Sequence, residues 1–274
     1  ASRGFPLQKT YAPDYRLIDL PSPREAAPGP IDLFELIEHR QSRREYSAEP
    51  ITLAQLSFLL WATQGVKRVV KEGFATMRTV PSGGSRHAFE TYLAANRVDG
   101  LEPGIYRYLA LEHKLLRMSS PPDLHAQLGA ACCGQNYVGT AAVVFFWSCI
   151  PYRCEWRYSV AAHKTLAQDS GHVCQNLYIA CEALGLGTVA IGSYHQETAD
   201  TLLGLDGVDH EFVRAGGTTG WGIAWQRPGR NRGPAKKELE FVHVFAAIIL
   251  QLVHICSIIY VAVVQAHAFP SMLT

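Results

Sequence analysis

The sequence predicts a mixed α+β fold, because helical and strand-like patterns alternate irregularly along it. Two segments carry this prediction. Residues 141–148, AAVVFFWS, form an uninterrupted apolar run with the length of a strand that is covered on both faces. Residues 159–184 repeat apolar side chains with a period of about 3.6 residues, and Gly185 ends this long predicted helix. Together they indicate a central sheet with a long helix packed on it.

Two shorter helices are expected nearer the N-terminus. Residues 31–40 carry an apolar side chain at every third position, as one face of a helix does. Thr52 and Gln55 form a capping box that opens a second helix, and Gly65 ends it. Because residues 56–61 are nearly all apolar, we expect this second helix to be buried.

The remaining elements are short. Tyr, Leu and Val are frequent in two further segments, which therefore read as strands separated by a Pro-Gly turn. The expected strands are 89–98, 104–109, 188–191 and 210–213, with a helix at 197–203 that Gly204 closes.

Composition excludes several classes of protein. With 25 Lys and Arg against 24 Asp and Glu, the net charge is +1, which does not suit a dedicated nucleic-acid binder. The chain is 48% hydrophobic, enough for a core. Its seven cysteines show no C-x-x-C spacing, so we expect no metal site and no disulfide framework, and a cytoplasmic compartment.

The charge is distributed unevenly and divides the chain into four parts. Residues 1–30 contain six prolines and are expected to form an extended lead-in. Residues 31–213 form the predicted domain, and the chain up to residue 213 has 19 basic and 22 acidic side chains. Residues 214–240, with six basic and two acidic side chains, are expected to be a Gly- and Arg-rich linker. Residues 241–274 have no acidic, Lys or Arg side chain.

Two polar segments could bind a ligand. Residues 39–44, HRQSRR, offer three guanidiniums and a hydroxyl that could hold a phosphate, or they could be a solvated basic helix end. Residues 79–87, TVPSGGSRH, place two glycines between serines, so that backbone N–H groups could approach a ligand closely. An ordinary turn is the alternative for this second segment.

Six segments, taken in order, resemble the FMN-dependent nitroreductase superfamily, and within it the branch that includes the SagB-type dehydrogenases. They span residues 31–213, about two thirds of the chain. The segments are R-x-S-x-R at 40–44, LLWATQG at 59–65, PSGGSRH at 81–87, PGIY at 103–106, EWRY at 155–158 and GHVCQNLY at 171–178.

The resemblance implies a mainly antiparallel central sheet flanked by helices, and a homodimer with FMN at its interface. It also implies which residues contact the flavin. Arg40, Ser42 and Arg44 would hold the phosphate and the ring edge, Ser82, Gly83, Gly84, Ser85 and Arg86 would line the isoalloxazine and ribityl chain, and Ile191 and Gly192 would face the ring.

The implied activity is two-electron transfer through flavin N5, as an NAD(P)H-linked reduction of a small organic acceptor. A SagB-type dehydrogenase that oxidises azoline rings in a peptide is the alternative, and a flavin-binding protein without catalysis is a third. In the SagB-type branch a Lys-Tyr pair is the expected base. This sequence has Arg157 and Tyr158 as the catalytic candidates, and Arg cannot act as a base because it stays charged.

The resemblance fades after residue 213, and residues 241–264 allow three interpretations. These 24 residues contain no Asp, Glu, Lys or Arg and are long enough to span a bilayer. They could be a membrane anchor, with Lys236 and Lys237 on the cytoplasmic side. They could be a helix that packs on the partner subunit, or sequence outside the family produced by an altered reading frame.

Overall fold

The computed structural model describes residues 6–70, 73–205 and 258–266, and it confirms the α+β class. Seven strands form the central sheet in the order β1-β8-β7-β5-β9-β11-β10, and every neighbouring pair is antiparallel. The strands are β1 (Leu17–Asp19), β5 (Phe89–Ala95), β7 (Gly104–Leu109), β8 (Lys114–Ser119), β9 (Val143–Cys149), β10 (Leu186–Ile191) and β11 (Ile258–Ala266).

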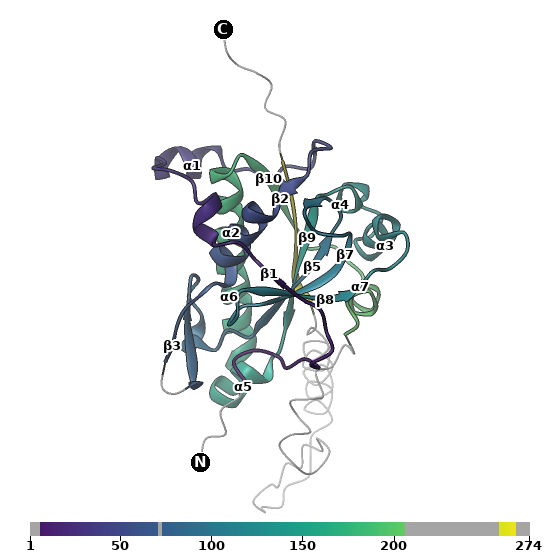
Figure 1. Cartoon of the computed structure of the whole chain (residues 1–274). Coiled ribbons are helices and arrows are strands. Elements are labelled where there is room, and N and C mark those ends of the chain that lie inside the picture. Colours follow the sequence, from purple (N-terminus) through teal and green to yellow (C-terminus); the bar gives the residue numbers. More distant parts are fainter. Residues whose placement is uncertain (1–5, 71–72, 206–257, 267–274) are drawn as a thin grey trace, which may run out of the picture.

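Helices cover both faces of this sheet (Figure 1). One face carries α2 (Leu53–Gln64) and α6 (Ala162–Ala183), and the other carries α3 (Leu124–Ala131), α4 (Asn136–Gly139) and α7 (Gln196–Leu203). Two separate clusters of buried apolar side chains correspond to these two layers. The fold is therefore a three-layer arrangement with the sheet in the middle.

Strand β9 lies in the interior of the sheet, as the apolar run predicted. All seven of its residues are buried. Phe145 and Trp147 belong to the cluster on the α2 and α6 side, whereas Val144 and Phe146 belong to the cluster under α3 and α7. Successive side chains of a strand point to opposite faces, so a strand buried on both sides needs an apolar residue at each position.

The helix signals in the sequence are accurate. Thr52 caps α2 through the predicted capping box with Gln55, and Gly65 follows its last residue. The helix is buried as expected, except that Trp61 is 38% exposed. Helix α6 is preceded by the 3-10 turn η4 (Ser159–Ala161), so that the two together cover the predicted helix.

The structure also contains short elements that sequence patterns did not reveal. Strand β1 and the 3-10 helix η1 (Pro23–Ala26) lie in the predicted lead-in. The others are β8, α3, α4, α5 (Tyr152–Tyr158), the turn η3 (Gly83–Ser85), the hairpin of β3 (Val66–Val70) and β4 (Ala75–Arg78), and the parallel pair of β2 (Ile51–Thr52) and β6 (Val98–Asp99). Helix α1 (Leu33–His39), in contrast, was expected from the sequence.

The position of strand β11 does not follow the division of the chain that the composition suggested. It comes from the uncharged segment 241–274, yet it lies inside the sheet between β9 and β10. An uncharged strand suits this position because both of its faces are covered. The sheet therefore uses residues on either side of 31–213. The expected strand at 210–213 lies outside the described residues, and within the described ranges no helix has the length and apolar character needed to cross a bilayer.

The place of β11 can be tested at Val264. This side chain is fully buried and its residue pairs with Thr188 on one side and Val143 on the other. We expect Val264→Ala to lower the free energy of unfolding by about 2 kcal/mol, the cost of two buried methyl groups and the remaining cavity. Urea denaturation measures this. The control is Val160→Ala, because Val160 is 88% exposed; equal effects of the two changes would contradict the strand.

Candidate functional site

The predicted loop at Ser82 is held by a carboxylate on α6. The Ser82 hydroxyl donates to Asp169 Oδ2 at 2.6 Å, and the Gly83 N–H donates to Asp169 Oδ1 at 3.1 Å. Asp169 is only 4% exposed. Burial raises the pKa of this carboxyl, while the two hydrogen bonds act in the opposite direction. The loop is thus fixed to α6 by a buried side chain whose two carboxylate oxygens each accept a hydrogen bond from it.

Gly84 brings this loop against the end of α5. Its φ of +59° is in the left-handed region, and a side chain there would overlap the Tyr158 hydroxyl and lie 3.3 Å from Arg157 Cζ. Ser85 and His87 also have positive φ, 56° and 45°. Non-glycine residues pay for such conformations, which are concentrated at functional sites. The structure therefore brings together the loop and the two catalytic candidates.

Arg86 lies between two aromatic rings. Its Cζ is 4.8 Å from the centroid of Phe74 and 5.2 Å from that of Trp156, and its Nε donates to the Gly84 carbonyl at 2.8 Å. Burial and then the charge of Arg157 lower the pKa of Arg86. The guanidinium is therefore held in place by cation–π contacts with two rings and by the loop itself.

The predicted phosphate residues lie at the other end of α6. Arg40 Cζ lies 5.1 Å from the ring centroid of Tyr178, and Ser42 Oγ is 2.8 Å from the Tyr178 hydroxyl. That hydroxyl also accepts a hydrogen bond of 2.9 Å from the Ala190 N–H of β10. One tyrosine thus connects the segment 40–44 to both α6 and β10.

The predicted phosphate residue Arg44 and its neighbour Arg43 have different environments. Arg43 forms an ion pair with Glu182, with N–O distances of 2.7 and 3.0 Å, and its side chain is 13% exposed. Arg44 is exposed and makes no hydrogen bond or ion pair within the described part of the chain. Arg43 therefore has a structural partner, whereas Arg44 is available to a ligand.

Both groups of predicted residues are attached to α6. Asp169 and Tyr178 are nine residues apart in this helix, a separation of roughly 14 Å along its axis. Ile191 is buried at the end of β10, whereas the next residue, Gly192, is exposed and has open space at its Cα. The two groups of predicted residues are therefore linked through a single helix.

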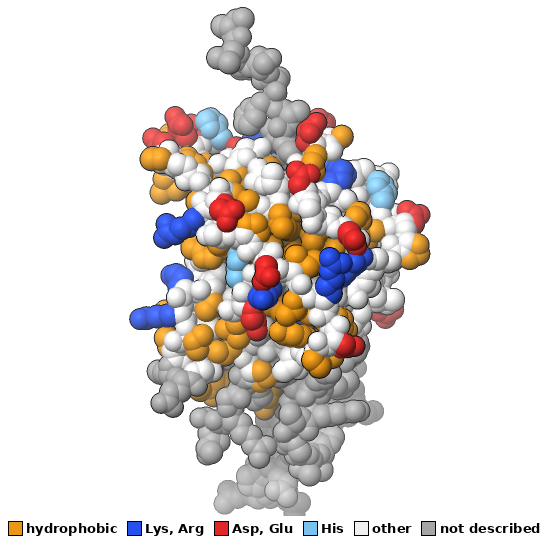
Figure 2. Space-filling view, in the orientation of Figure 1, with side chains coloured by type: hydrophobic (Ala, Val, Ile, Leu, Met, Phe, Trp, Pro, Cys, Tyr) orange, Lys and Arg blue, Asp and Glu red, His pale blue; other side chains and the backbone are white. Residues whose placement is uncertain are grey.

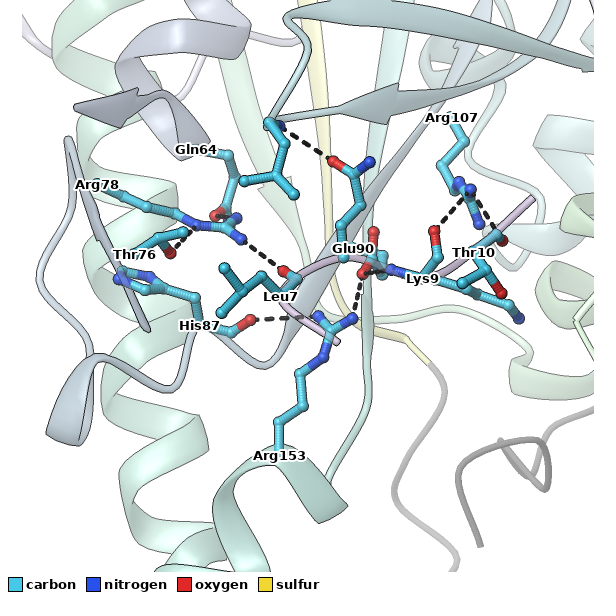
Figure 3. A network of polar contacts seen from close by, with 12 residues as sticks. Leu7, Lys9, Thr10, Gln64, Thr76, Arg78, His87, Glu90, Arg107 and Arg153 are labelled. Atoms are coloured by element: carbon cyan, nitrogen blue, oxygen red, sulfur yellow. Dashed lines mark hydrogen bonds and ion pairs between the residues drawn. The ribbon is translucent and has the colours of Figure 1, made fainter. Parts of the chain in front are cut away.

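A buried charge network next to the loop was not apparent from the sequence (Figure 3). Glu90 of β5 pairs with Arg153 of α5 at 2.5 Å and accepts from the Lys9 N–H at 2.7 Å. Arg107 donates to the carbonyls of Lys9 and Thr10 at 3.1 and 3.2 Å. Charged residues inside the predicted strands FETYL and GIYRYL were the available signal, because a buried charge requires partners.

Arg78 extends this network toward α2. It donates to Gln64 Oε1 at 2.9 Å and to the Leu7 carbonyl at 3.2 Å. Burial is the main cause that lowers the pKa of Arg78 to about 10, and the charge of Arg153 acts in the same direction. The guanidiniums of Arg78, Arg107 and Arg153 therefore all interact electrostatically with the carboxylate of Glu90. The same network holds the N-terminal segment 6–11 in place through hydrogen bonds to its backbone.

Comparisons with known proteins identify the relatives of this chain. The profile of the Nitroreductase family matches residues 37–221. A candidate nitroreductase of Methanocaldococcus jannaschii is 32% identical over 63% of this chain and 84% of its own length. A candidate nitroreductase structure from Anabaena variabilis has a TM-score of 0.63 and 20% identity; the match covers 93% of this chain and 42% of that one.

A chain of the Escherichia coli microcin synthetase McbBCD complex, solved with truncated pro-MccB17 bound, is also similar. Its TM-score is 0.55 with 12% identity, and the match covers 88% of this chain and 76% of the other. These solved structures confirm the predicted fold. They do not test the individual site residues.

His87 makes the loop sensitive to acid. It is 6% exposed, and burial followed by the charges of Arg78, Arg86 and Arg153 lowers its pKa to about 3. The unfolded chain takes up this proton near pH 6.5, so stability falls as the pH decreases below that value. We expect a loss of about 1.4 kcal/mol per pH unit from this group between pH 6 and pH 4.

Urea denaturation at several pH values measures this loss. Between pH 6 and pH 4, His87→Gln should reduce the slope of the free energy of unfolding against pH by the contribution of one proton. The exposed His195 provides the control, since His195→Gln should leave the slope unchanged. Identical slopes for wild type and His87→Gln would show that His87 is protonated in the folded state.

Proposed function

This chain belongs to the nitroreductase family, and we propose on that premise that it is an FMN-dependent oxidoreductase. It would take electrons from NAD(P)H and reduce a small organic acceptor. The observation that supports this proposal most directly is the position of Gly84. A loop that could follow a flat ring closely lies beside a phenol and a guanidinium that could contact the substrate.

The residues at the phosphate end fit the charge of FMN. Arg40 and Arg44 offer guanidinium donors, and Ser42 adds a hydroxyl. Bidentate N–H donors match phosphate oxygens in geometry and charge. Arg44 has these donors available, and Arg40 is positioned by the ring of Tyr178. We assign the flavin phosphate to these three residues.

The residues at the ring end fit a flat aromatic group. In residues 82–86, Gly84 is exposed and has no side chain of its own, so its backbone can lie against a ligand beside Tyr158 and Arg157, and Asp169 keeps the loop in place. Ile191 and the open Gly192 would complete the contact from β10. When bound, FMN supplies two-electron transfer.

Tyr158 and Arg157 have separate roles in this proposal. The Tyr158 hydroxyl, next to Gly84, can donate a proton to the acceptor as it is reduced. Arg157 stays charged, so it can bind and orient a polar substrate but cannot remove a proton. Two electrons and the protons from solvent or Tyr158 thus convert the acceptor to its reduced form.

We further propose that the working form is a homodimer. Arg44, Gly84 and Gly192 are exposed in one chain, and in this proposal a second chain covers them. Helix α1 supplies an apolar surface for this contact: Leu33 is 63%, Phe34 72% and Ile37 59% exposed. Apolar side chains are visible in this region, at the upper left of Figure 2. We place the enzyme in the cytoplasm, on the cysteine pattern of its sequence.

Oxidation of a peptide, as in the SagB-type branch, is the second candidate. The likeness to the chain of the microcin synthetase complex favours it. The missing lysine at Arg157 counts against it, because only Tyr158 would remain as a base. NAD(P)H oxidation that depends on a quinone or a nitro compound supports the reductase. Dehydrogenation of an azoline peptide without that reaction would support the alternative.

FMN binding tests the proposal first. The purified protein should be yellow, and denaturation should release FMN. Arg44→Ala should weaken FMN binding about tenfold or more, the worth of one charge-assisted hydrogen bond, without changing Tm. Quenching of FMN fluorescence on titration with apoprotein measures the dissociation constant.

The control for this change is Arg68→Ala, because Arg68 is another exposed arginine, on the β3–β4 hairpin. It should leave the dissociation constant as in the wild type. A colourless protein that does not bind added FMN would overturn the cofactor assignment. Equal affinity in the wild type and Arg44→Ala would remove Arg44 from the phosphate site.

The dimer is tested at α1. Phe34→Glu should convert the dimer to a monomer, because it places a charge in an apolar interface at no cost to the single chain. Light scattering after size-exclusion chromatography gives the mass. Val69→Glu is the matched control, since Val69 is 51% exposed on the hairpin. A wild-type monomer, or a dimer that survives Phe34→Glu, would contradict the proposed interface.

A further inference from the structure

A small cavity lies behind the loop, between two guanidiniums. Arg86 and Arg153 line it together with Ser85, the rings of Phe74 and Trp156, and the N-terminal residues Pro6 and Leu7. We propose that this cavity is a binding subsite for a compact anion, such as a carboxylate group. The proposal deepens the oxidoreductase function above and rests on it only for the identity of the substrate, not for the existence of the site.

The electrostatic surroundings of the cavity favour an anion. Glu90 is already paired with Arg153, and its charge is also felt by Arg78 and Arg107. The single negative charge of Glu90 therefore compensates three positively charged guanidiniums, which are only 2% to 6% exposed. Arg86 adds a further positive charge at the cavity wall. A cluster with this excess of buried positive charge is stabilised when an anion enters it.

Two neighbouring groups report the same positive field. The charges of Arg78, Arg86 and Arg153 help to hold the pKa of His87 near 3, so that His87 stays neutral. The charge of Arg157 helps to lower the pKa of Arg86 itself. Both pKa shifts are caused in part by positive charges that lie close together, and an anion bound between these charges would reduce their mutual repulsion.

Arg86 has donors left for a ligand. Only its Nε is used within the described residues, by the Gly84 carbonyl. Its two terminal nitrogens make no hydrogen bond there, although the guanidinium is fixed by Phe74 and Trp156. A guanidinium that is already immobilised loses little entropy on binding, and its paired N–H groups match the two oxygens of a carboxylate.

The size of the cavity limits the ligand. Its volume is about 20 Å³, which gives room for one or two water-sized groups. A carboxylate head is closer to this limit than the larger phosphate group. Because the Gly84 carbonyl binds Arg86 while Gly84 also abuts Tyr158, the subsite lies directly beside the proposed reaction site. An acceptor held there by its carboxylate would have its reducible group near Tyr158.

Formate is the probe for the site, and thermal unfolding is the first measurement. Sodium formate is compared with an equal concentration of sodium chloride, whose single-atom anion cannot accept the paired N–H groups of a guanidinium through two oxygens. At a tenfold excess over its dissociation constant, formate should raise Tm by about 3 °C or more. This difference should disappear in Arg86→Gln, become smaller in Arg86→Lys, and persist in the control Arg68→Gln.

A second measurement needs no change at Arg86. The Trp156 ring stacks on the Arg86 guanidinium, so formate should change the tryptophan emission saturably, and Trp156→Phe should lose this change. Absence of both the Tm difference and the emission change in the wild type overturns the proposal. Equal Tm differences in the wild type and Arg86→Gln also overturn it.

Matched acceptors identify the source of the anion. The ratio of kcat/KM for 4-nitrobenzoate to that for 4-nitrobenzamide should fall about tenfold in Arg86→Gln if the anion is the carboxylate of the substrate. An unchanged ratio with intact formate binding assigns the site to a free anion. Formate binding is measured without turnover. If the protein fails to bind FMN, the proposed function is wrong, but the formate measurements still show whether the anion subsite exists.

Discussion

Helix α6 is the element on which the candidate site depends. Its Asp169 holds the Ser82–Gly83 turn, and its Tyr178 holds Ser42 and the Ala190 N–H of β10. Loops are otherwise mobile parts of a fold, and a binding site on loops needs a rigid support. A single helix packed on the sheet keeps the two loops in register, so a change in its packing would displace both ends of the site together.

A second constraint comes from the buried arginines. Each guanidinium that is removed from water must be hydrogen-bonded, and the backbone carbonyls of Leu7, Lys9 and Thr10 meet much of that demand. The N-terminal segment is therefore part of the folded domain rather than a lead-in to it. Carbonyl oxygens satisfy hydrogen bonds but carry no full charge, which is why the cluster still attracts an anion.

Local signals predicted the elements that have local causes. The capping box at Thr52, the glycines after α2, α6 and α7, and the double-sided burial of β9 each follow from residues within a few positions. The contacts of Asp169 with Ser82, and of Arg153 with Glu90, join residues far apart in sequence, and no periodicity reveals them. The family resemblance supplied the site residues, and it selected the exposed Arg44 rather than Arg43, which pairs with Glu182.

The apolar C-terminal segment shows why hydropathy alone leaves alternatives open. A strand covered on both faces and a segment in a bilayer face the same physical demand, because neither can expose a charge to an apolar surrounding. Length does not separate the two here, because a strand needs only a few residues, a membrane helix about 20, and the uncharged run 241–264 has 24. The pairing decides, since the nine residues of β11 lie between β9 and β10 in the sheet. Gln265 is fully buried and its side-chain amide has no hydrogen-bond partner among the described residues, so this strand leaves one polar group unsatisfied inside the sheet.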